Sequence, residues 1–328
     1  MVQYSYKEKN KEMLNMEFNY VNRYIKRKSK ECRQSTLDQY KATITRFLLG
    51  IAKEKNIQDE MKLYESINND TIEDFYEVYS DTHKKSCENN SISIIRQFFD
   101  YLVEDKGLYK SNPFGAIKGY KPHVIQQSVK EKDLLTKEEM IRFIDELSVP
   151  YPDEKCFEFN SKRNQFLFSL MATTGLRIEE ALTLRLSDIE EKNGYVIAHI
   201  REENNKTHVS RNIPIANKCY ECYREYMKLR TSMDADEPFV FLSYRGKKLT
   251  KGAVNKIINK YTTRLGLNKH ITNHCFRHYA NVQLKANSVP DYTVKYLLGW
   301  HDKSMSATYY NHYTESYEKE LCRCVNII

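Results

Sequence analysis

Strand-forming sequence is confined to one region of this chain, and that confinement limits its possible folds more than any other feature. The runs GYVIAHI (residues 194–200) and VSRNIPI (209–215) are rich in β-branched side chains and are joined by the polar segment REENNKTH. Such a pattern predicts a β-hairpin, whose tip carries Lys206. The segment PFVFLSYRGKKLT, from Pro238, predicts a further strand and turn. Apolar spacing typical of helices fills the rest, so we expect a mainly α fold with a small β-sheet (α+β).

Helical spacing is clearest in the first third of the chain. Apolar residues recur there every three or four positions, as in Tyr40, Ile44, Phe47, Leu48 and Ile51, and again in Ile92, Ile95, Phe99 and Leu102. This periodicity places the apolar side chains on one face of each helix. It predicts a module of about four helices, which is in the size range of an independent domain.

The length of 328 residues and one unpatterned segment predict a division into two domains. The segment KGYKPHVIQQSVKEK, from Lys118, is basic and has no periodic apolar residues, which is typical of a linker. A second set of helices begins after it, where Thr136 and Glu139 are spaced as in a helix-capping box. We expect an N-terminal helical domain at residues 1–120, a linker at 121–132 and a second domain at 133–328.

The stretch from His274 to Tyr310 carries the residues best suited to chemistry. His274 and Arg277 lie three residues apart in a helical segment and therefore share a face. Arginine binds phosphate oxygens in pairs, histidine moves protons near neutral pH, and tyrosine can act as a covalent nucleophile. Neither a Gly-rich phosphate loop nor a carboxylate cluster for Mg²⁺ accompanies them in the sequence. The pattern favours metal-free chemistry on a phosphodiester over nucleotide hydrolysis.

A second arginine, Arg177, begins a short apolar helix directly after the turn at Gly175. An arginine flanked by so much apolar sequence needs either a partner or a ligand, because burying an unpaired charge is costly. The sequence leaves two alternatives open. Arg177 forms a structural ion pair, with Glu180 as the nearest candidate, or it binds an anionic ligand; taken alone, the ion pair is the more frequent case.

The composition of the chain indicates which kind of binding partner and which cellular compartment to expect. A formal net charge of +8 with 25 tyrosines favours a nucleic-acid partner, although a basic solvated surface gives the same balance. The N-terminus has no apolar signal segment, and the apolar stretch around Phe166 to Met171 is too short to span a bilayer. The eight cysteines are scattered, and the Cys219–Cys222 pair has no second pair to complete a zinc site. We expect a cytoplasmic protein with reduced thiols, no membrane association, no metal and no cofactor.

Four motifs in this order resemble the tyrosine recombinase family of the phage-integrase and Xer type. They are TGLRIEEALTLRLSDI, the hairpin lysine followed by SRNIPI, HCFRH, and LLGWHDKSMSATYYNH, behind a helical module and a linker. The resemblance covers nearly the whole chain. It implies an N-terminal DNA core-binding domain and a catalytic domain that cuts and rejoins DNA strands through a 3′-phosphotyrosyl intermediate and a Holliday junction. The expected role is integration or excision of a mobile element.

The resemblance also implies a catalytic set, which is Arg177, Lys206, His274, Arg277, His301 and Tyr310. The two arginines would hold the scissile phosphate, the two histidines would support it, and Lys206 would protonate the leaving 5′ oxygen. Tyr310 would be the nucleophile. The family spacing leads to Tyr310 from His301 and to Tyr309 from Trp300, and the Tyr310-Asn311-His312 pattern favours Tyr310.

The same resemblance implies double-stranded DNA as partner, a homotetramer on two DNA sites, and an accessory DNA-bending or directionality factor. Three alternatives remain. A Xer-like enzyme would resolve chromosome or plasmid dimers. A type IB topoisomerase would relax supercoils with a similar catalytic set. A DNA-binding protein without catalysis would bind the same substrate and leave it uncut.

Overall fold

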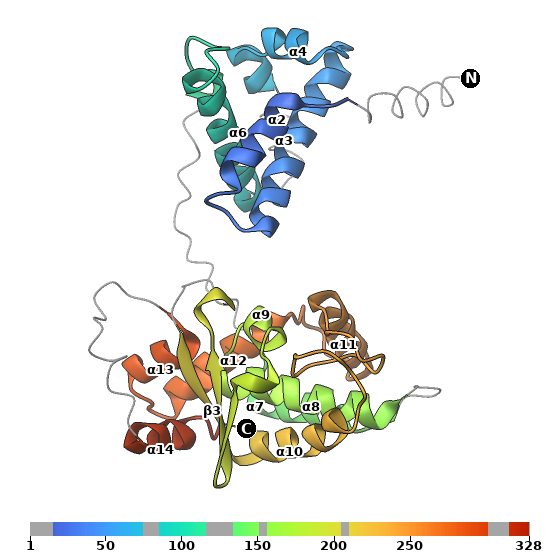
Figure 1. The fold of residues 1–328 in the computed structure, drawn as a ribbon, viewed down its shortest axis with the longest axis vertical. Coiled ribbons are helices and arrows are strands. Elements are labelled where there is room, and N and C mark those ends of the chain that lie inside the picture. Colours follow the sequence, from blue (N-terminus) through green and yellow to red (C-terminus); the bar gives the residue numbers. More distant parts are fainter. Residues whose placement is uncertain are drawn as a thin grey trace. The chain divides into compact units, whose positions relative to one another are not determined.

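The computed structural model describes residues 16–74, 85–115, 134–150, 156–204, 210–300 and 315–327. This part of the chain is mainly helical and contains a three-stranded antiparallel sheet (Figure 1), which confirms the predicted fold class. The chain divides into two compact units, Met1–Ile125 and Gln126–Ile328. Over the described ranges, none of the helices is long and apolar enough to cross a membrane.

The first unit is built from helices around an aromatic core. Its elements are α2 (Asn19–Lys28), α3 (Gln34–Lys55), α4 (Glu60–Ser66), α6 (Lys85–Glu104) and the 3-10 turn η1 (Pro113–Gly115). Helices α2, α3 and α6 pack on one another. Phe47, Phe99 and Phe114 are fully buried, and the ring centroids of Phe99 and Phe114 lie 5.3 Å apart. The apolar spacing seen in the sequence therefore forms one continuous core.

The second unit is organised around one helix whose second half is buried on every side. Its helices are α7 (Lys137–Glu146), α8 (Phe157–Thr174), α9 (Ile178–Leu182), α10 (Asn217–Thr231), α11 (Lys251–Arg264), α12 (Asn273–Ala286), α13 (Asp291–Leu298) and α14 (Glu315–Cys324), with 3-10 turns η3 (Leu186–Asp188) and η4 (Glu202–Asn204). Every residue of α8 from Phe166 to Thr174 is buried, between α10 and α12. Such a helix must lie at the centre of its domain. It ends at Gly175, with φ of +66°, and delivers Arg177 to the middle of the unit.

The sheet consists of β1 (Ile189–Lys192), β2 (Tyr195–Ile200) and β3 (Arg211–Ile215), hydrogen-bonded in that order. The pairing of β2 with β3 confirms the predicted hairpin, and its tip at residues 205–209 lies outside the described residues. Strand β1 was not predicted. The strand predicted from Pro238 is wrong, because that segment makes only isolated bridges, one between Arg185 and Phe239 and one between Leu242 and Lys248.

Helix α14 packs on the body of its own unit, against β3 (Figure 1). Leu321 and Val325 are buried, and the buried Glu318 carboxylate accepts a hydrogen bond of 2.7 Å from the Tyr195 hydroxyl. The Tyr279 hydroxyl donates to the backbone carbonyl of Ile327 over 3.2 Å. These contacts place the end of the chain against the same strand and helix that border the candidate site.

Candidate functional site

Helix α12 carries the predicted His-x-x-Arg pair. Arg277 is buried and His274, one turn earlier, is exposed. The Arg277 guanidinium donates to the Gly175 carbonyl over 2.7 Å and to the Leu298 carbonyl over 2.6 Å. One side chain thus joins the end of α8 to the end of α13. The two segments lie far apart in the sequence, and Arg277 brings them together.

Arg177 reaches the same place from the start of α9. Its backbone N–H and its guanidinium donate to the Glu180 carboxylate over 2.8 and 3.1 Å, and Nη2 reaches the Gly299 carbonyl at 3.4 Å. The ion pair with Glu180 that the sequence left open is therefore present. The Arg177 side chain nevertheless remains 22% exposed, whereas that of Glu180 is 1% exposed. An incoming ligand has access to the guanidinium but not to the carboxylate.

A third arginine, Arg211 at the start of β3, completes what we call the arginine cluster (Arg177, Arg211 and Arg277). Its Nε donates to the Leu297 carbonyl over 3.3 Å. Three consecutive carbonyls at the end of α13, those of Leu297, Leu298 and Gly299, therefore accept from three different arginines. The last carbonyls of a helix have no partner within it and form the negative end of its dipole. The cluster satisfies these carbonyls and fixes the point where the chain leaves α13.

Glu180 is the counter-charge of the cluster. Arg211 donates to its two carboxylate oxygens over 3.2 and 2.8 Å. Burial alone would raise the pKa of the Glu180 carboxyl, but Arg211 and Arg177 outweigh it and hold that pKa below its ordinary value. Glu180 is therefore ionised at neutral pH. One carboxylate faces three guanidinium groups, so the site carries an excess of positive charge.

Arg277 carries much of that excess. Burial and the nearby Arg177 lower its pKa to about 9, which still leaves the guanidinium charged at neutral pH. Within the described ranges no carboxylate lies within ion-pair distance of Arg277, and its ring contact is with Trp300, whose centroid lies 5.7 Å from the guanidinium carbon. A buried cation held only by carbonyls and an indole is suited to an anionic ligand.

His274 lies beside this positive charge and next to a polar pocket. Burial, followed by the charges of Lys251 and Arg277, lowers the pKa of its imidazole below the usual 6.5. His274 is therefore neutral at pH 7 and can donate one hydrogen bond. A pocket of about 350 Å³ opens alongside, lined by Lys251, Asn255, His270 and Asn273 among others. Amide, ammonium and imidazole groups of this kind suit a phosphodiester backbone.

The lowered pKa of His274 gives a direct prediction. In the free protein we expect its imidazole to titrate below 6.5, because protonation adds charge to a site that is already positive. Bound DNA phosphate should raise that pKa, since an anion stabilises the imidazolium. Lys251→Met should raise it as well, because Lys251 is the largest charge that opposes protonation. NMR titration of the His274 ring measures its pKa in the free protein, in the DNA complex and in Lys251→Met. A pKa that falls on binding DNA would contradict a phosphate beside His274.

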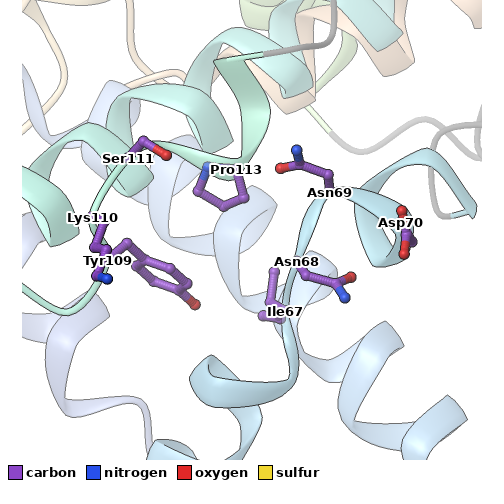
Figure 2. A pocket seen from close by; sticks show the side chains of 8 residues that line it. All are labelled: Ile67, Asn68, Asn69, Asp70, Tyr109, Lys110, Ser111 and Pro113. Carbon is purple, nitrogen blue, oxygen red and sulfur yellow. The ribbon is translucent and has the colours of Figure 1, made fainter.

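A second hollow, in the first unit, is a weaker candidate. Figure 2 shows its lining side chains, which come from the segments at residues 67–70 and 109–113. The hollow measures about 400 Å³, and its charged lining residues are Asp70 and Lys110. Because these two charges are opposite, the lining has no excess of positive charge that would bind an anion. The hollow lies in the other unit from the arginine cluster.

The structure brings together part of the predicted catalytic set. Arg177 and Arg277 converge on the end of α13 and His274 lies beside their charges, whereas Lys206, His301, Tyr310 and the alternative Tyr309 lie outside the described residues. Sequence reasoning missed Arg211, although an arginine within the apolar run VSRNIPI was an available signal. In the part of the chain that the structure describes, no group of three or more His, Cys, Asp or Glu side chains could hold a metal ion.

Gly299 provides a test of the packing over the cluster. A Cβ at this position would lie 2.7 Å from both Cζ and Nη1 of Arg211, and the backbone has φ of +61°. We expect Gly299→Ala to destabilise the second unit by more than the roughly 1–2 kcal/mol that a left-handed non-glycine residue costs. The extra loss arises because the guanidinium cannot move without leaving Glu180. Urea denaturation measures the change.

Gly266→Ala is the matched control for Gly299→Ala. Gly266 has a similar φ of +62°, but no atom lies within 4 Å of the position its Cβ would take. It therefore reports the backbone strain alone, and the difference between the two variants isolates the clash with Arg211. Equal losses of unfolding free energy in both would show that Arg211 has room to move.

Known proteins share both sequence and fold with this chain. A family model described as the phage integrase family matches residues 134–316. The tyrosine recombinase XerC of Halalkalibacterium halodurans is 27% identical over 75% of this chain and 77% of its own length. The tyrosine recombinase XerD of Oceanobacillus iheyensis is 25% identical over 88% of this chain and 90% of its own.

Two solved structures extend the comparison to the fold. The XerH site-specific recombinase bound to palindromic difH substrate superposes with a TM-score of 0.66 at 17% identity, covering 92% of this chain and 94% of that one. A lambda integrase dimer bound to a COC′ core site gives a TM-score of 0.63 at 19% identity, covering 88% of this chain and 96% of that one. At such identities the superpositions establish a common fold.

Proposed function

The chain belongs to the phage integrase family of tyrosine recombinases, and on this premise we propose that Arg177, Arg277 and His274 bind the scissile phosphate of a DNA strand. The protein is a site-specific recombinase, an enzyme that exchanges DNA strands. One observation supports the proposed site above all others. Arg177 and Arg277 meet at the end of α13, directly before the segment that contains Tyr310.

The residue types account for the chemistry. The Tyr310 hydroxyl gives its proton to water as its oxygen attacks phosphorus, the bond from phosphorus to the 5′ oxygen breaks, and a proton from Lys206 completes the leaving hydroxyl. Guanidinium groups fixed beside the phosphate stabilise the charge that grows on its oxygens. Neutral His274 donates a hydrogen bond to the same phosphate, and His301 supports it. Arg177 and Arg277 supply the positive charge that a metal ion provides in other phosphoryl-transfer sites, so we propose cleavage without metal or ATP.

The product explains how strands are exchanged. The 3′-phosphotyrosyl bond keeps the energy of the broken linkage, so the 5′ hydroxyl of a second strand can reverse the step. Two such exchanges pass through a Holliday junction and need four protomers on two sites. A lambda integrase tetramer bound to a Holliday junction shares this fold, with a TM-score of 0.61. We assign core-site binding to the helical domain at residues 1–120 and chemistry to residues 133–328, joined by the linker at 121–132.

The role that fits these parts is integration or excision of a mobile element in the cytoplasm, aided by an accessory DNA-bending or directionality factor. A Xer-like resolvase is the second candidate, because relatives named XerC and XerD align over most of their own length. The two roles differ in substrate. A resolvase acts on two copies of one short site in a chromosome or plasmid dimer, whereas an element's enzyme acts on inverted repeats that flank the element's own junctions.

A nicked duplex that contains the recognised site tests the function. Cleavage beside the nick releases a short fragment, so the covalent complex cannot religate and accumulates as a slowly migrating band on a denaturing gel. We expect this band with the wild-type protein, with the DNA attached through its 3′ phosphate, and we expect it to persist with a chelator present. DNA binding without a covalent product would favour the non-catalytic alternative, and relaxation of a plasmid without the site would favour a topoisomerase.

A further inference from the structure

Arg211 is a buried cation at the centre of the site, outside the set expected to touch the phosphate. Its side chain is 1% exposed, and it pairs with the equally buried Glu180. We propose that Arg211 is a positioning residue that neutralises Glu180 and holds the end of α13, and thereby keeps Arg177 available for the phosphate. This proposal rests on the cleavage activity proposed above and adds to it a residue that acts through its neighbours.

Charge balance is the first argument. Glu180 accepts from Arg211 at both carboxylate oxygens and also from the Arg177 guanidinium. With Arg211 present, the single carboxylate is shared and Arg177 keeps much of its positive charge for a ligand. Without Arg211, the full negative charge of a buried carboxylate would fall on Arg177. The phosphate would then compete with Glu180 for the same guanidinium.

Direction is the second argument. The Arg211 donors point into the protein, with Nη1 and Nη2 directed to Glu180 and Nε to the Leu297 carbonyl. Arg177, by contrast, is 22% exposed. Arg211 therefore lacks the access that a phosphate-binding residue needs. It acts on the reaction only through the groups that it holds.

Connection is the third argument. Arg211 lies at the first position of β3, where it pairs with Ile200, so it stands at the last strand pair before the loop that carries Lys206. The same side chain reaches Glu180 on α9 and the Leu297 carbonyl at the end of α13. Gly299 leaves the space that its guanidinium occupies. Arg211 thus links the loop end of the hairpin to the α9 helix that follows Arg177 and to the end of α13, which precedes the segment that contains Tyr310.

The test compares Arg211→Met with the double variant Arg211→Met/Glu180→Gln on the nicked duplex at saturating DNA. We expect Arg211→Met to slow single-turnover cleavage about 10²-fold, the size of loss that a misplaced catalytic group produces. The double variant should cleave about tenfold faster than Arg211→Met, because it has no carboxylate to compete for Arg177. The single variant Glu180→Gln completes the double-mutant cycle, which measures the coupling between Arg211 and Glu180.

The pH profile separates this role from a merely structural one. The charged groups that act on Glu180 are Arg177 from its own helix cap, Arg211 from β3 and Arg277 from α12, and Lys251 acts on His274. In Arg211→Met the carboxyl loses its main cationic partner and protonates more easily. Its cleavage rate relative to wild type should therefore rise as the pH falls from about 8 to about 6, and this rise should be absent in the double variant.

Arg230→Met is the matched control, because Arg230 is also buried in this unit but donates to the backbone carbonyls of Glu237 and Phe239. It should lose stability while the folded fraction cleaves at the wild-type rate. If Arg211→Met does not fold, Arg211→Lys replaces it. That variant keeps the charge and loses the bond to Leu297, so we expect about tenfold slower cleavage with the wild-type pH profile.

The outcomes are distinguishable. Wild-type cleavage by the folded Arg211→Met or Arg211→Lys variant would overturn the proposal. So would a double variant as slow as Arg211→Met with a flat pH ratio, since Arg211 would then act as packing alone. Absence of a covalent complex with the wild-type protein would instead overturn the proposed function, before any variant is compared.

Discussion

Replacing Tyr310 by phenylalanine is expected to abolish the covalent protein–DNA complex, whereas Tyr309→Phe should leave it intact. The phenolic oxygen is the atom that bonds to phosphorus, and phenylalanine has no atom that can take its place. The loss should therefore be complete, and DNA affinity should be nearly unchanged. A denaturing gel with the nicked duplex reports the covalent complex, and a filter-binding or mobility-shift assay reports the affinity.

Comparing Tyr310→Phe with Tyr309→Phe decides which of the two tyrosines is the nucleophile, which the motif spacing leaves open. The spacing reaches Tyr310 from His301 and Tyr309 from Trp300. The Tyr-x-His pattern favours Tyr310. In the structure, 5.7 Å separates the Arg277 guanidinium carbon from the Trp300 ring centroid, and His301 lies outside the described residues. A complex that survives Tyr310→Phe and disappears with Tyr309→Phe would mean that the spacing starts at Trp300. The nucleophile would then be Tyr309.

Features set by neighbouring residues were predictable from the sequence. The capping box at α7 is present, with the Glu139 N–H donating to the Thr136 hydroxyl over 3.2 Å and the Thr136 N–H donating to the Glu139 carboxylate over 2.8 Å. The β2–β3 hairpin also formed where β-branched runs flank a polar connection. Caps, helical faces and short hairpins depend on contacts within a few residues, and the sequence order alone determines these contacts.

One local feature was missed, and one prediction that depended on distant partners was wrong. Strand β1, with the sequence IEEK, is short and polar, yet it pairs with β2 across Gly194, whose φ is +87°. An Asn-Gly pair at residues 193–194 was the available signal. For the segment from Pro238 the error was the opposite one, since a strand was predicted there and is not formed. Its apolar residues look like a strand, but they are buried for packing and form only isolated bridges.

In the candidate site too, residues placed by local spacing were predicted and a residue placed by distant contacts was not. Spacing within one helix put His274 and Arg277 on one face, and the short helix after Gly175 drew attention to Arg177. The role of Arg211 could not be read in this way, because its partners lie 31 and 86 residues away along the chain. The two alternatives for Arg177 also prove compatible. Its ion pair with Glu180 is shared with Arg211, which leaves Arg177 partly exposed.

Replacing Arg277 by glutamine is expected to slow cleavage about 10³-fold, or roughly 4 kcal/mol of transition-state stabilisation. The side chain supplies positive charge where charge develops on the phosphate oxygens, and it also holds the Gly175 and Leu298 carbonyls. Arg277→Lys keeps the charge but cannot reach both carbonyls, so we expect a smaller loss of about 10²-fold. Single-turnover cleavage of the nicked duplex at saturating DNA measures both.

The same variants should have a small effect on folding. The pKa of Arg277 is lowered to about 9 by burial and by Arg177, so the folded state binds this proton less tightly than the unfolded chain does. A lowered pKa on a base means that its charge opposes folding below that pKa, and this penalty is fully present at neutral pH. Arg277→Gln removes the penalty and at the same time leaves two carbonyls without their donor. The two effects act in opposite directions.

Arg230 provides the comparison that separates catalysis from stability. It is 3% exposed and donates over 3.2 Å from Nε and 3.0 Å from Nη2 to the Phe239 carbonyl, and over 2.6 Å to that of Glu237. We expect Arg230→Gln to lose about 3 kcal/mol of unfolding free energy with cleavage by the folded protein unchanged. Arg277→Gln should lose less stability and far more activity. A site that evolved only to hold the fold together would give the reverse order, so urea denaturation and cleavage rates measured on both variants decide whether the positive charge at Arg277 is retained for the phosphate.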